Sequence, residues 1–180
     1  DMIGAYLGLV TEILSSGISN VSDLELAVST ALVVRPPFAF MNKLGVASAL
    51  EHVEAYAKKH PGFPVPEALR KQAATGRPWK IPVVLREDRG DVAVVKIRRP
   101  AVLNALNRQV MEELREIFTA VKADPSIKAA VLTGFGTRAF VSGADIKELA
   151  AMKNPDEGAA FSWNCLLYTS DAADEEDSVD

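Results

Sequence analysis

The segment over residues 139–149 contains the residues whose types and spacing suit chemistry. Gly143 allows a tight backbone path, and a new helix is predicted to begin near Asp145. The N–H groups of Ala144 and Asp145 then lie at the start of that helix, where backbone donors have no partner within the helix. Such donors, with the positive end of a helix behind them, suit a carbonyl oxygen that gains negative charge during a reaction. Lys147, in the first turn, is placed to meet a phosphate or another group of an anionic ligand.

A simpler interpretation of the same segment stays open. Asp145 can cap a surface helix with its side chain, and Lys147 can be an ordinary solvated lysine. Spacing alone favours this simpler interpretation, so the segment needs a second, independent feature before it indicates a site.

The loop just before this segment invites a different interpretation. Residues 134–139 read GFGTRA and match the G-x-G-x-x-A pattern of dinucleotide-binding folds, directly after a predicted strand. That pattern requires a helix to begin within the loop, so that its N-terminus meets the pyrophosphate. Residues 140–143 delay the next helix, and the sequence therefore predicts no dinucleotide site here.

Composition places the chain among ordinary globular proteins. It has 180 residues, of which 48% are hydrophobic and 24% charged, which excludes wholesale disorder, collagen and coiled coil. Residues 1–164 hold 20 basic and 18 acidic residues, and so balanced a charge gives no electrostatic basis for nucleic-acid binding. Apolar runs are too short for a membrane span. The single cysteine, Cys165, cannot form an intramolecular disulfide, which fits a reducing, cytoplasmic location; we also expect no metal site.

The last 16 residues differ from the rest of the chain. Residues 165–180 carry six acidic and no basic residues, and they show neither helical nor strand periodicity. They resemble the translated read-through of a sequencing adapter; the alternative is a natural acidic tail. We therefore expect a disordered tail without function over 165–180, and a fragment whose meaningful sequence ends at Asn164.

The elements that must position these residues fall into two parts, joined by a linker. Residues 1–76 show helical spacing of apolar residues, and Ser22 and Glu25 have the spacing of a capping box. Residues 77–82, with two prolines, are predicted to form the linker. The expected elements of the first part are helices over 2–16, 22–33, 46–60 and 66–76, with a turn over 38–44.

The second part, residues 83–164, alternates between strands and helices. Two strands flank an Asp-Arg-Gly-Asp turn typical of a hairpin, and a later apolar run is typical of a buried parallel strand. This order predicts an α/β fold with a β-α-β crossover. The expected elements are strands over 83–87 and 92–98, a helix capped by Asn107, a strand over 129–133 and a helix from Asp145.

Two stretches of this second part, RPAVLNALN at 99–107 and VLTGFGTRAFVSGADIKEL at 131–149, together resemble the enoyl-CoA hydratase/isomerase (crotonase) family. The resemblance implies a repeated ββα spiral, here truncated, that binds acyl-CoA and assembles as a homo-oligomer. It implies that the Ala144 N–H is one of two oxyanion-hole donors to a thioester carbonyl. The residues that it implies for substrate binding are Ala144, Asp145, Ile146 and Lys147 in one stretch, and Arg99, Ala105 and Leu106 in the other.

The acid/base groups of that family do not match any residue near the motif. Hydration of a double bond needs carboxylates that deprotonate water and protonate the α-carbon. Asp145 and Glu148 are the only acids close by, and neither matches a catalytic position of the family. We expect the chain to hold half an oxyanion hole, no acid/base pair and no hydratase turnover of its own.

Residues 1–76 resemble the C-terminal helical domain of 3-hydroxyacyl-CoA dehydrogenases, through residues 17–28 and 35–45. The resemblance implies dimerisation, closure over acyl-CoA, and NAD bound by a domain before Asp1, with no cofactor held by this chain itself. A dehydrogenase followed by a hydratase resembles fused enzymes of fatty acid β-oxidation. The alternatives are an enoyl-CoA isomerase, or a non-catalytic module that combines helical oligomerisation with CoA binding.

Overall fold

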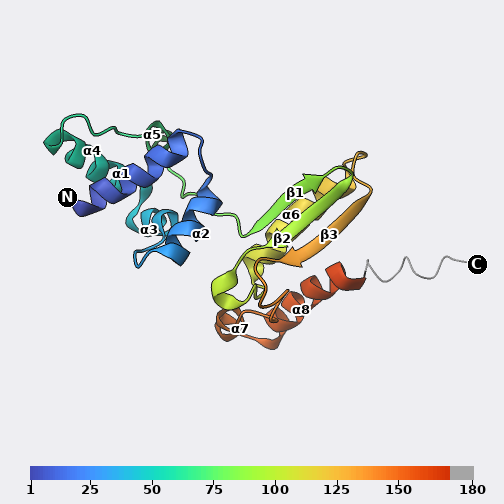
Figure 1. Cartoon of the computed structure of the whole chain (residues 1–180). Coiled ribbons are helices and arrows are strands. Elements are labelled where there is room, and N and C mark those ends of the chain that lie inside the picture. Colours follow the sequence, from blue (N-terminus) through green and yellow to red (C-terminus); the bar gives the residue numbers. More distant parts are fainter. Residues whose placement is uncertain (171–180) are drawn as a thin grey trace, which may run out of the picture. The chain divides into compact units, whose positions relative to one another are not determined.

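The computed structural model describes residues 1–170, with side chains described as far as Trp163 (Figure 1). The chain divides into two compact units, Asp1–Pro82 and Val83–Asp180. The predicted linker over 77–82 belongs to the first unit, because Trp79 is buried in the core of that unit.

The first unit is all helical. Four helices were expected, and the turn predicted over 38–44 is a fifth helix, so that prediction is wrong. Pro37 occupies the first turn of this helix, where its missing N–H costs nothing, and Gly45, at φ 93°, ends it. The helices are α1 (Met2–Ser15), α2 (Val21–Ala31), α3 (Pro37–Leu44), α4 (Val46–Lys59) and α5 (Glu67–Ala74).

The core of the first unit draws on all five helices. Leu7, Phe38 and Val53 are fully buried there, and the Trp79 ring meets the Phe38 ring edge-on with centroids 5.1 Å apart. α1 packs closely on α4 because Gly4 has no side chain: a Cβ there would lie 2.3 Å from the carbonyl oxygen of His52.

The start of α2 differs from the predicted capping box. Asn20, not Ser22, is the N-cap, and its side chain accepts from the Asp23 N–H at 2.9 Å. The Ser22 hydroxyl instead donates to the carbonyl of Pro82 at 2.7 Å. The capping box was therefore wrong, because a tertiary contact uses the hydroxyl that the local pattern assigned to the helix.

Glu25, the other half of the predicted box, serves a different helix. Its carboxylate accepts from the N–H groups of Phe38 and Ala39 at 2.7 and 3.0 Å, which satisfies two donors at the start of α3. Burial raises the pKa of Glu25 above its ordinary value, although these two backbone hydrogen bonds act to lower it.

The second unit, over its described residues 83–170, combines a small sheet with three α-helices. β1 pairs antiparallel with β2, and β2 pairs parallel with β3, which confirms the predicted hairpin and the predicted parallel strand. β1, β2 and α6 make one ββα unit (Figure 1). The elements are β1 (Val84–Arg89), β2 (Val92–Ile97), a 3-10 turn (Pro100–Val102), α6 (Arg108–Lys122), β3 (Ala129–Gly134), α7 (Ile146–Ala151) and α8 (Pro155–Ser170).

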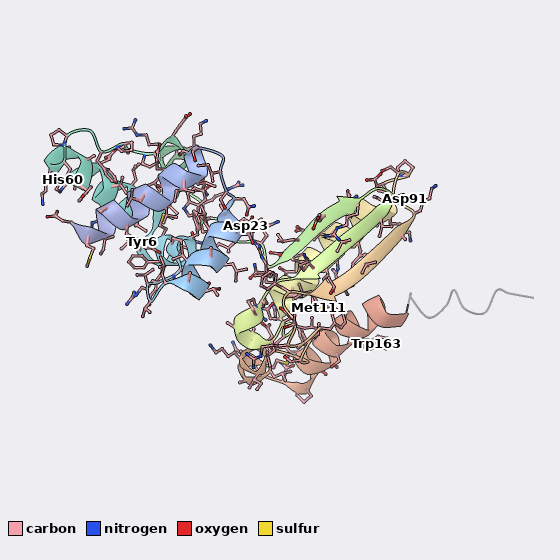
Figure 2. The ribbon with its side chains drawn as sticks, in the orientation of Figure 1. Tyr6, Asp23, His60, Asp91, Met111 and Trp163 are labelled. Atoms are coloured by element: carbon pink, nitrogen blue, oxygen red, sulfur yellow. The ribbon has the colours of Figure 1, made fainter. Side chains whose placement is uncertain are left out.

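α6 covers one face of this sheet. Asn107 is its N-cap, as predicted, and accepts from the Val110 N–H at 3.0 Å. Met111, labelled in Figure 2, belongs to the core that α6 forms with the sheet. The buried members of that core are Val84, Val95, Ile97, Val110, Met111 and Leu114.

Glu113 of α6 is a buried charged residue, which the apolar pattern of the helix did not predict. Only 6% of it is exposed, and its Oε2 accepts from the N–H groups of Val83 and Val84, both at 2.8 Å. Oε1 accepts from the Gln109 side-chain amide at 3.0 Å. Glu113 therefore fixes the start of β1 to α6.

α8 extends into the segment that was expected to be a disordered tail. The structure assigns residues 165–170 to this helix, whose start is favoured by Pro155 and by Asp156 and Glu157 in its first turn. Residues 171–180, the rest of that segment, lie outside the described residues. Over residues 1–170, no helix has the length and apolar character needed to cross a membrane.

Candidate functional site

Two loops meet beside the sheet. Residues 98–107 join β2 to α6, and residues 135–145 join β3 to α7. Both loops leave the same edge of the sheet, since β2 and β3 are parallel. A parallel bridge joins them: the Leu106 N–H donates to the Gly143 carbonyl at 2.9 Å, and the Asp145 N–H donates to the Leu106 carbonyl at 2.7 Å.

The register of this bridge directs the Ala144 N–H away from Leu106. In a parallel bridge, the central residue of one strand is held through the peptide groups of its two neighbours, and its own N–H and carbonyl face the other side. Within the described part of the chain, nothing accepts a hydrogen bond from the Ala144 N–H. Ala144 is half-buried. An unpaired backbone donor in such a place is available to a ligand.

Gly143 permits this arrangement. Its φ is 118°, in a region that side-chain-bearing residues rarely adopt, which agrees with the prediction that Gly143 allows a tight backbone path.

The expectation that the Asp145 N–H is also free is wrong, because Leu106 accepts from it. The Asp145 side chain instead caps α7 by accepting from the Lys147 N–H at 3.0 Å, as the simpler interpretation held. α7 has only six residues, so little of the donor strength at Ala144 comes from a helix dipole. The donor depends on the bridge register instead.

Arg99 ties the two loops together through its side chain. The guanidinium donates to Asp145 Oδ2 at 2.7 Å and to the Ala105 carbonyl, and the two charged side chains are only 17% and 10% exposed. The Arg99 hydrogen bond is the main reason that the pKa of Asp145 lies below its ordinary value, and the Lys147 N–H adds to it. Arg99, Ala105 and Asp145 thus form an internal network, and their contact with a ligand stays a prediction.

Asn104 is the residue at this junction that sequence reasoning missed. It is 1% exposed and has φ 58°, in the left-handed region that asparagine tolerates better than most residues. Its Oδ1 accepts from the Arg99 N–H at 3.0 Å, and its Nδ2 donates to the carbonyls of Phe135 and Ala139 at 3.0 and 2.9 Å. The only signal in the sequence was an asparagine within a loop, which does not distinguish a buried side chain from a solvated one.

The other predicted ligand contacts lie outside this network. Ile146 is 80% exposed and Lys147 is exposed, so both are accessible to a ligand. Glu148 lies 3.6 Å from Arg108 in an ion pair. Among the side chains that the structure describes, residues 1–163, no group of three or more His, Cys, Asp or Glu could hold a metal ion.

The G-x-G-x-x-A loop behaves as its sequence context predicted. No helix begins within it, and the next helix starts only at Ile146. The loop lines an open depression of about 380 Å³ in which Arg138 is the charged residue. The first requirement of a dinucleotide site, a helix N-terminus in the loop, is therefore not met.

Comparisons with known proteins find similarity in the second unit. Residues 87–170 match the family model for enoyl-CoA hydratase/isomerase. The chain is 44% identical over 78 residues to a short-chain-enoyl-CoA hydratase of Clostridium acetobutylicum, covering 43% of this chain and 30% of that protein. It is 38% identical over 79 residues to a crotonyl-CoA hydratase of Syntrophomonas wolfei, covering 42% and 30%.

A crystal structure of an enoyl-CoA hydratase from Thermoplasma volcanium is also similar. It is 32% identical, with a TM-score of 0.42, over 46% of this chain and 32% of that one. The chain spans about a third of the length of the relatives it matches. Residues 87–170, in the second unit, are therefore similar to a segment of the enoyl-CoA hydratase/isomerase family.

Proposed function

We propose that the whole protein acts on acyl-CoA thioesters as an enoyl-CoA hydratase of fatty acid β-oxidation, and that the Ala144 N–H polarises the thioester carbonyl. The observation that carries the proposal is the direction of this N–H, which the Leu106 bridge leaves without an acceptor among the described residues. Relatives named for the hydration of short-chain enoyl-CoA and crotonyl-CoA support the substrate class.

The chemistry of hydration explains why such a donor matters. When water adds to the β-carbon of an enoyl thioester, electron density moves onto the thioester oxygen, and an N–H fixed beside that oxygen stabilises the charge. One donor of this kind contributes about 3–4 kcal/mol to the transition state in enzymes with a comparable oxyanion hole. Because a backbone N–H is already oriented, it needs no rearrangement during the reaction.

The acids near Ala144 do not suit the acid/base steps. Asp145 is paired with Arg99, and Glu148 is paired with Arg108. We therefore assign only carbonyl polarisation to this segment. We assign the acid/base carboxylates and the second donor to the part of the whole protein that corresponds to the two thirds of its relatives not covered by this chain. The 180-residue chain alone is expected to show no hydratase turnover.

The accessible residues beside the donor complete the proposed binding site. Lys147 is exposed one turn from Ala144 and suits a phosphate of CoA, while Ile146 offers an apolar surface. Leu106 contributes through the bridge. For Arg99, Ala105 and Asp145 we propose an indirect role. They hold their loop in place, and the edge of that loop contacts the ligand.

For the first unit we propose the role of a helical domain of a 3-hydroxyacyl-CoA dehydrogenase, with NAD bound elsewhere. The support is the resemblance over residues 17–28 and 35–45, together with a five-helix unit that has a core of its own. Assembly into a homo-oligomer belongs to the same proposal. The non-catalytic alternative keeps the acyl-CoA site and omits turnover, and it is favoured by the paired state of both nearby acids.

Binding of a labelled ligand tests the proposal directly. The chain is titrated with crotonyl-CoA carrying ¹³C at the thioester carbonyl, and the carbonyl stretch is followed by difference infrared spectroscopy. We expect the band of the bound ligand to move to lower frequency. CoA without an acyl group is the control for binding through the CoA moiety alone.

The donor itself is removed by replacing Ala144 with the α-hydroxy acid analogue, lactic acid, which exchanges the N–H for an ester oxygen and keeps the side chain. This variant should still bind and should lose most of the band shift. The same replacement at Ala123, remote from the bridge, should keep it. An unshifted carbonyl band for the unmodified chain would contradict the proposed role of Ala144.

A further inference from the structure

Asn104 connects both sides of the bridge that orients the Ala144 N–H. On one side it holds the Arg99 N–H, at the start of the loop that leads to Leu106. On the other side it holds the carbonyls of Phe135 and Ala139, in the loop that leads to Ala144. The three hydrogen bonds use both polar atoms of a side chain that is almost fully buried.

The backbone at this position needs such support. Leu103 and Asn104 have φ of 51° and 58°, two successive residues in the left-handed region. Leucine is unfavourable there because its Cβ crowds the following carbonyl oxygen. Such conformations persist when the surrounding structure fixes them. This reversal of the backbone matters because it directs the chain, two residues later, to the bridge at Leu106.

Further contacts fix the same two loops against each other. The Ser142 N–H donates to the Leu103 carbonyl at 3.1 Å, just before the bridge at Leu106. Gly134 closes the space behind Asn104: a Cβ there would lie 2.7 Å from Asn104 Nδ2 and 2.2 Å from the Phe140 carbonyl oxygen. Asn104 therefore has no room to move toward β3 while these hydrogen bonds exist.

We propose that Asn104 is a positioning residue that sets the direction of the Ala144 N–H through Leu106. The inference rests on the proposed function for the identity of the acceptor, a thioester carbonyl. It does not place Asn104 in contact with the ligand. Loss of its side chain should therefore change how the carbonyl is polarised more than how tightly acyl-CoA is bound.

Three variants separate the parts of this role. Asn104→Gly removes all three hydrogen bonds and still permits positive φ. Asn104→Asp keeps the acceptor for the Arg99 N–H and places an oxygen against the Phe135 and Ala139 carbonyls. Asn154→Gly is the matched control, because Asn154 caps the start of α8 by accepting from the Glu157 N–H and does not join the two loops.

The first measurement needs no ligand. Amide hydrogen exchange is followed by NMR at Leu106 and Asp145, whose N–H groups form the bridge. Asn104→Gly should speed their exchange about tenfold or more, while the β2–β3 ladder keeps its protection. Asn104→Asp should fall between that variant and wild type, and Asn154→Gly should leave both amides unchanged. Unchanged exchange in Asn104→Gly would overturn the inference.

The second measurement repeats the carbonyl infrared titration. Asn104→Gly should bind crotonyl-CoA within about threefold of wild type and lose most of the band shift. Affinity and band shift that fall together, with general loss of exchange protection, would mean a merely structural role and would overturn the inference. If the unmodified chain binds no acyl-CoA, the proposed function fails, and the exchange data alone decide whether Asn104 holds the bridge.

Discussion

The first unit (the helical unit) and the second unit (the sheet unit) are each stabilised by a different kind of interaction. In the helical unit every helix contributes a buried apolar residue to one core. In the sheet unit the buried core comes from β1, β2 and α6, whereas β3 and α7 contribute no buried residue. The two loops that carry the candidate site are joined instead by the hydrogen bonds of Arg99, Asn104 and Leu106.

This difference shows how the chain separates stability from geometry. Apolar burial is not directional, and its free energy is shared among many weak contacts. Hydrogen bonds are directional and weaken steeply away from alignment. A network of them therefore fixes the direction of individual backbone groups in the two loops, while the packed core holds the five helices of the first unit together.

The largest expected effect breaks the core of the helical unit. Phe38→Ala should destabilise this unit by about 3–5 kcal/mol, because Phe38 is fully buried against Trp79. Urea unfolding followed by Trp79 fluorescence, in a Trp163→Phe background, measures it. Val33→Ala, at a fully exposed position, should change the free energy of unfolding by less than about 0.5 kcal/mol. An equal loss in both variants would show that the core does not dominate.

The next effect removes the buried carboxylate of the sheet unit. Glu113→Ala should cost that unit about 2–4 kcal/mol, since the N–H groups of Val83 and Val84 lose their acceptor. Glu113→Gln keeps an oxygen for them and should cost about half as much. Circular dichroism during urea unfolding gives the values, with Glu112→Ala, an exposed neighbour on α6, as the control. Similar losses at both positions would contradict the assigned role.

Two glycines offer a sharper comparison between the units. An alanine at Gly4 would place its Cβ 2.3 Å from the His52 carbonyl oxygen, and one at Gly134 would place it 2.2 Å from that of Phe140. Each should cost its own unit about 1–3 kcal/mol and leave the other unit unchanged. Gly158→Ala in α8, where the added Cβ would have Met152 Sδ as its nearest neighbour at 3.8 Å, should be neutral or slightly stabilising. NMR-detected unfolding assigns each loss to a unit, and a loss shared by both units would refute their independence.

The smallest expected effect is the pH dependence of stability, which should have opposite signs for the carboxyl groups of Asp145 and Glu25. The pKa of Asp145 is lowered, chiefly by Arg99, so its contribution to stability is complete above about pH 4 and is lost as the pH falls below its ordinary pKa. The pKa of Glu25 is raised by burial, so its carboxylate opposes folding above that raised pKa, and the opposition disappears as the pH falls.

Urea midpoints from pH 6 to 3.5, each compared with Asp145→Asn or Glu25→Gln, isolate the two contributions. The stability of wild type relative to Asp145→Asn should fall with acid, whereas its stability relative to Glu25→Gln should rise. Parallel slopes in wild type and variant would show that the carboxyl group has no perturbed pKa.

Much of the second unit could be predicted from local patterns. The hairpin, the Asn107 cap and the glycine turn before Ala144 each depend on residues close together in sequence, and the parallel strand was predicted from its own apolar run, although its partner β2 lies 37 residues earlier. Two of the errors share one cause, which is a contact between distant segments. Glu25 has the spacing of a capping box with Ser22, but its carboxylate accepts from the start of α3 instead. The Asp145 N–H has no acceptor in its own helix and donates to the Leu106 carbonyl.

Two other features carried no usable sequence signal. α3 is short and begins at a pair of prolines, so its apolar spacing resembled a turn. Asn104 is buried in a loop, where no periodicity separates inside from outside. Residues that hold loops together through side-chain hydrogen bonds become evident only once the loops have been placed.

The span of chain closed by the Arg99–Asp145 pair has a consequence for the order of folding. These partners are 46 residues apart, and α6 and β3 lie between them. Contacts of such long range form late, because the intervening chain loses entropy before they can be made. The hairpin of β1 and β2, in contrast, closes over a two-residue turn. A refolding chain should therefore form its β1–β2 hairpin early and the contacts between the two loops late, so that a kinetic intermediate with a native hairpin would still lack the orientation of the Ala144 N–H that the proposed function requires.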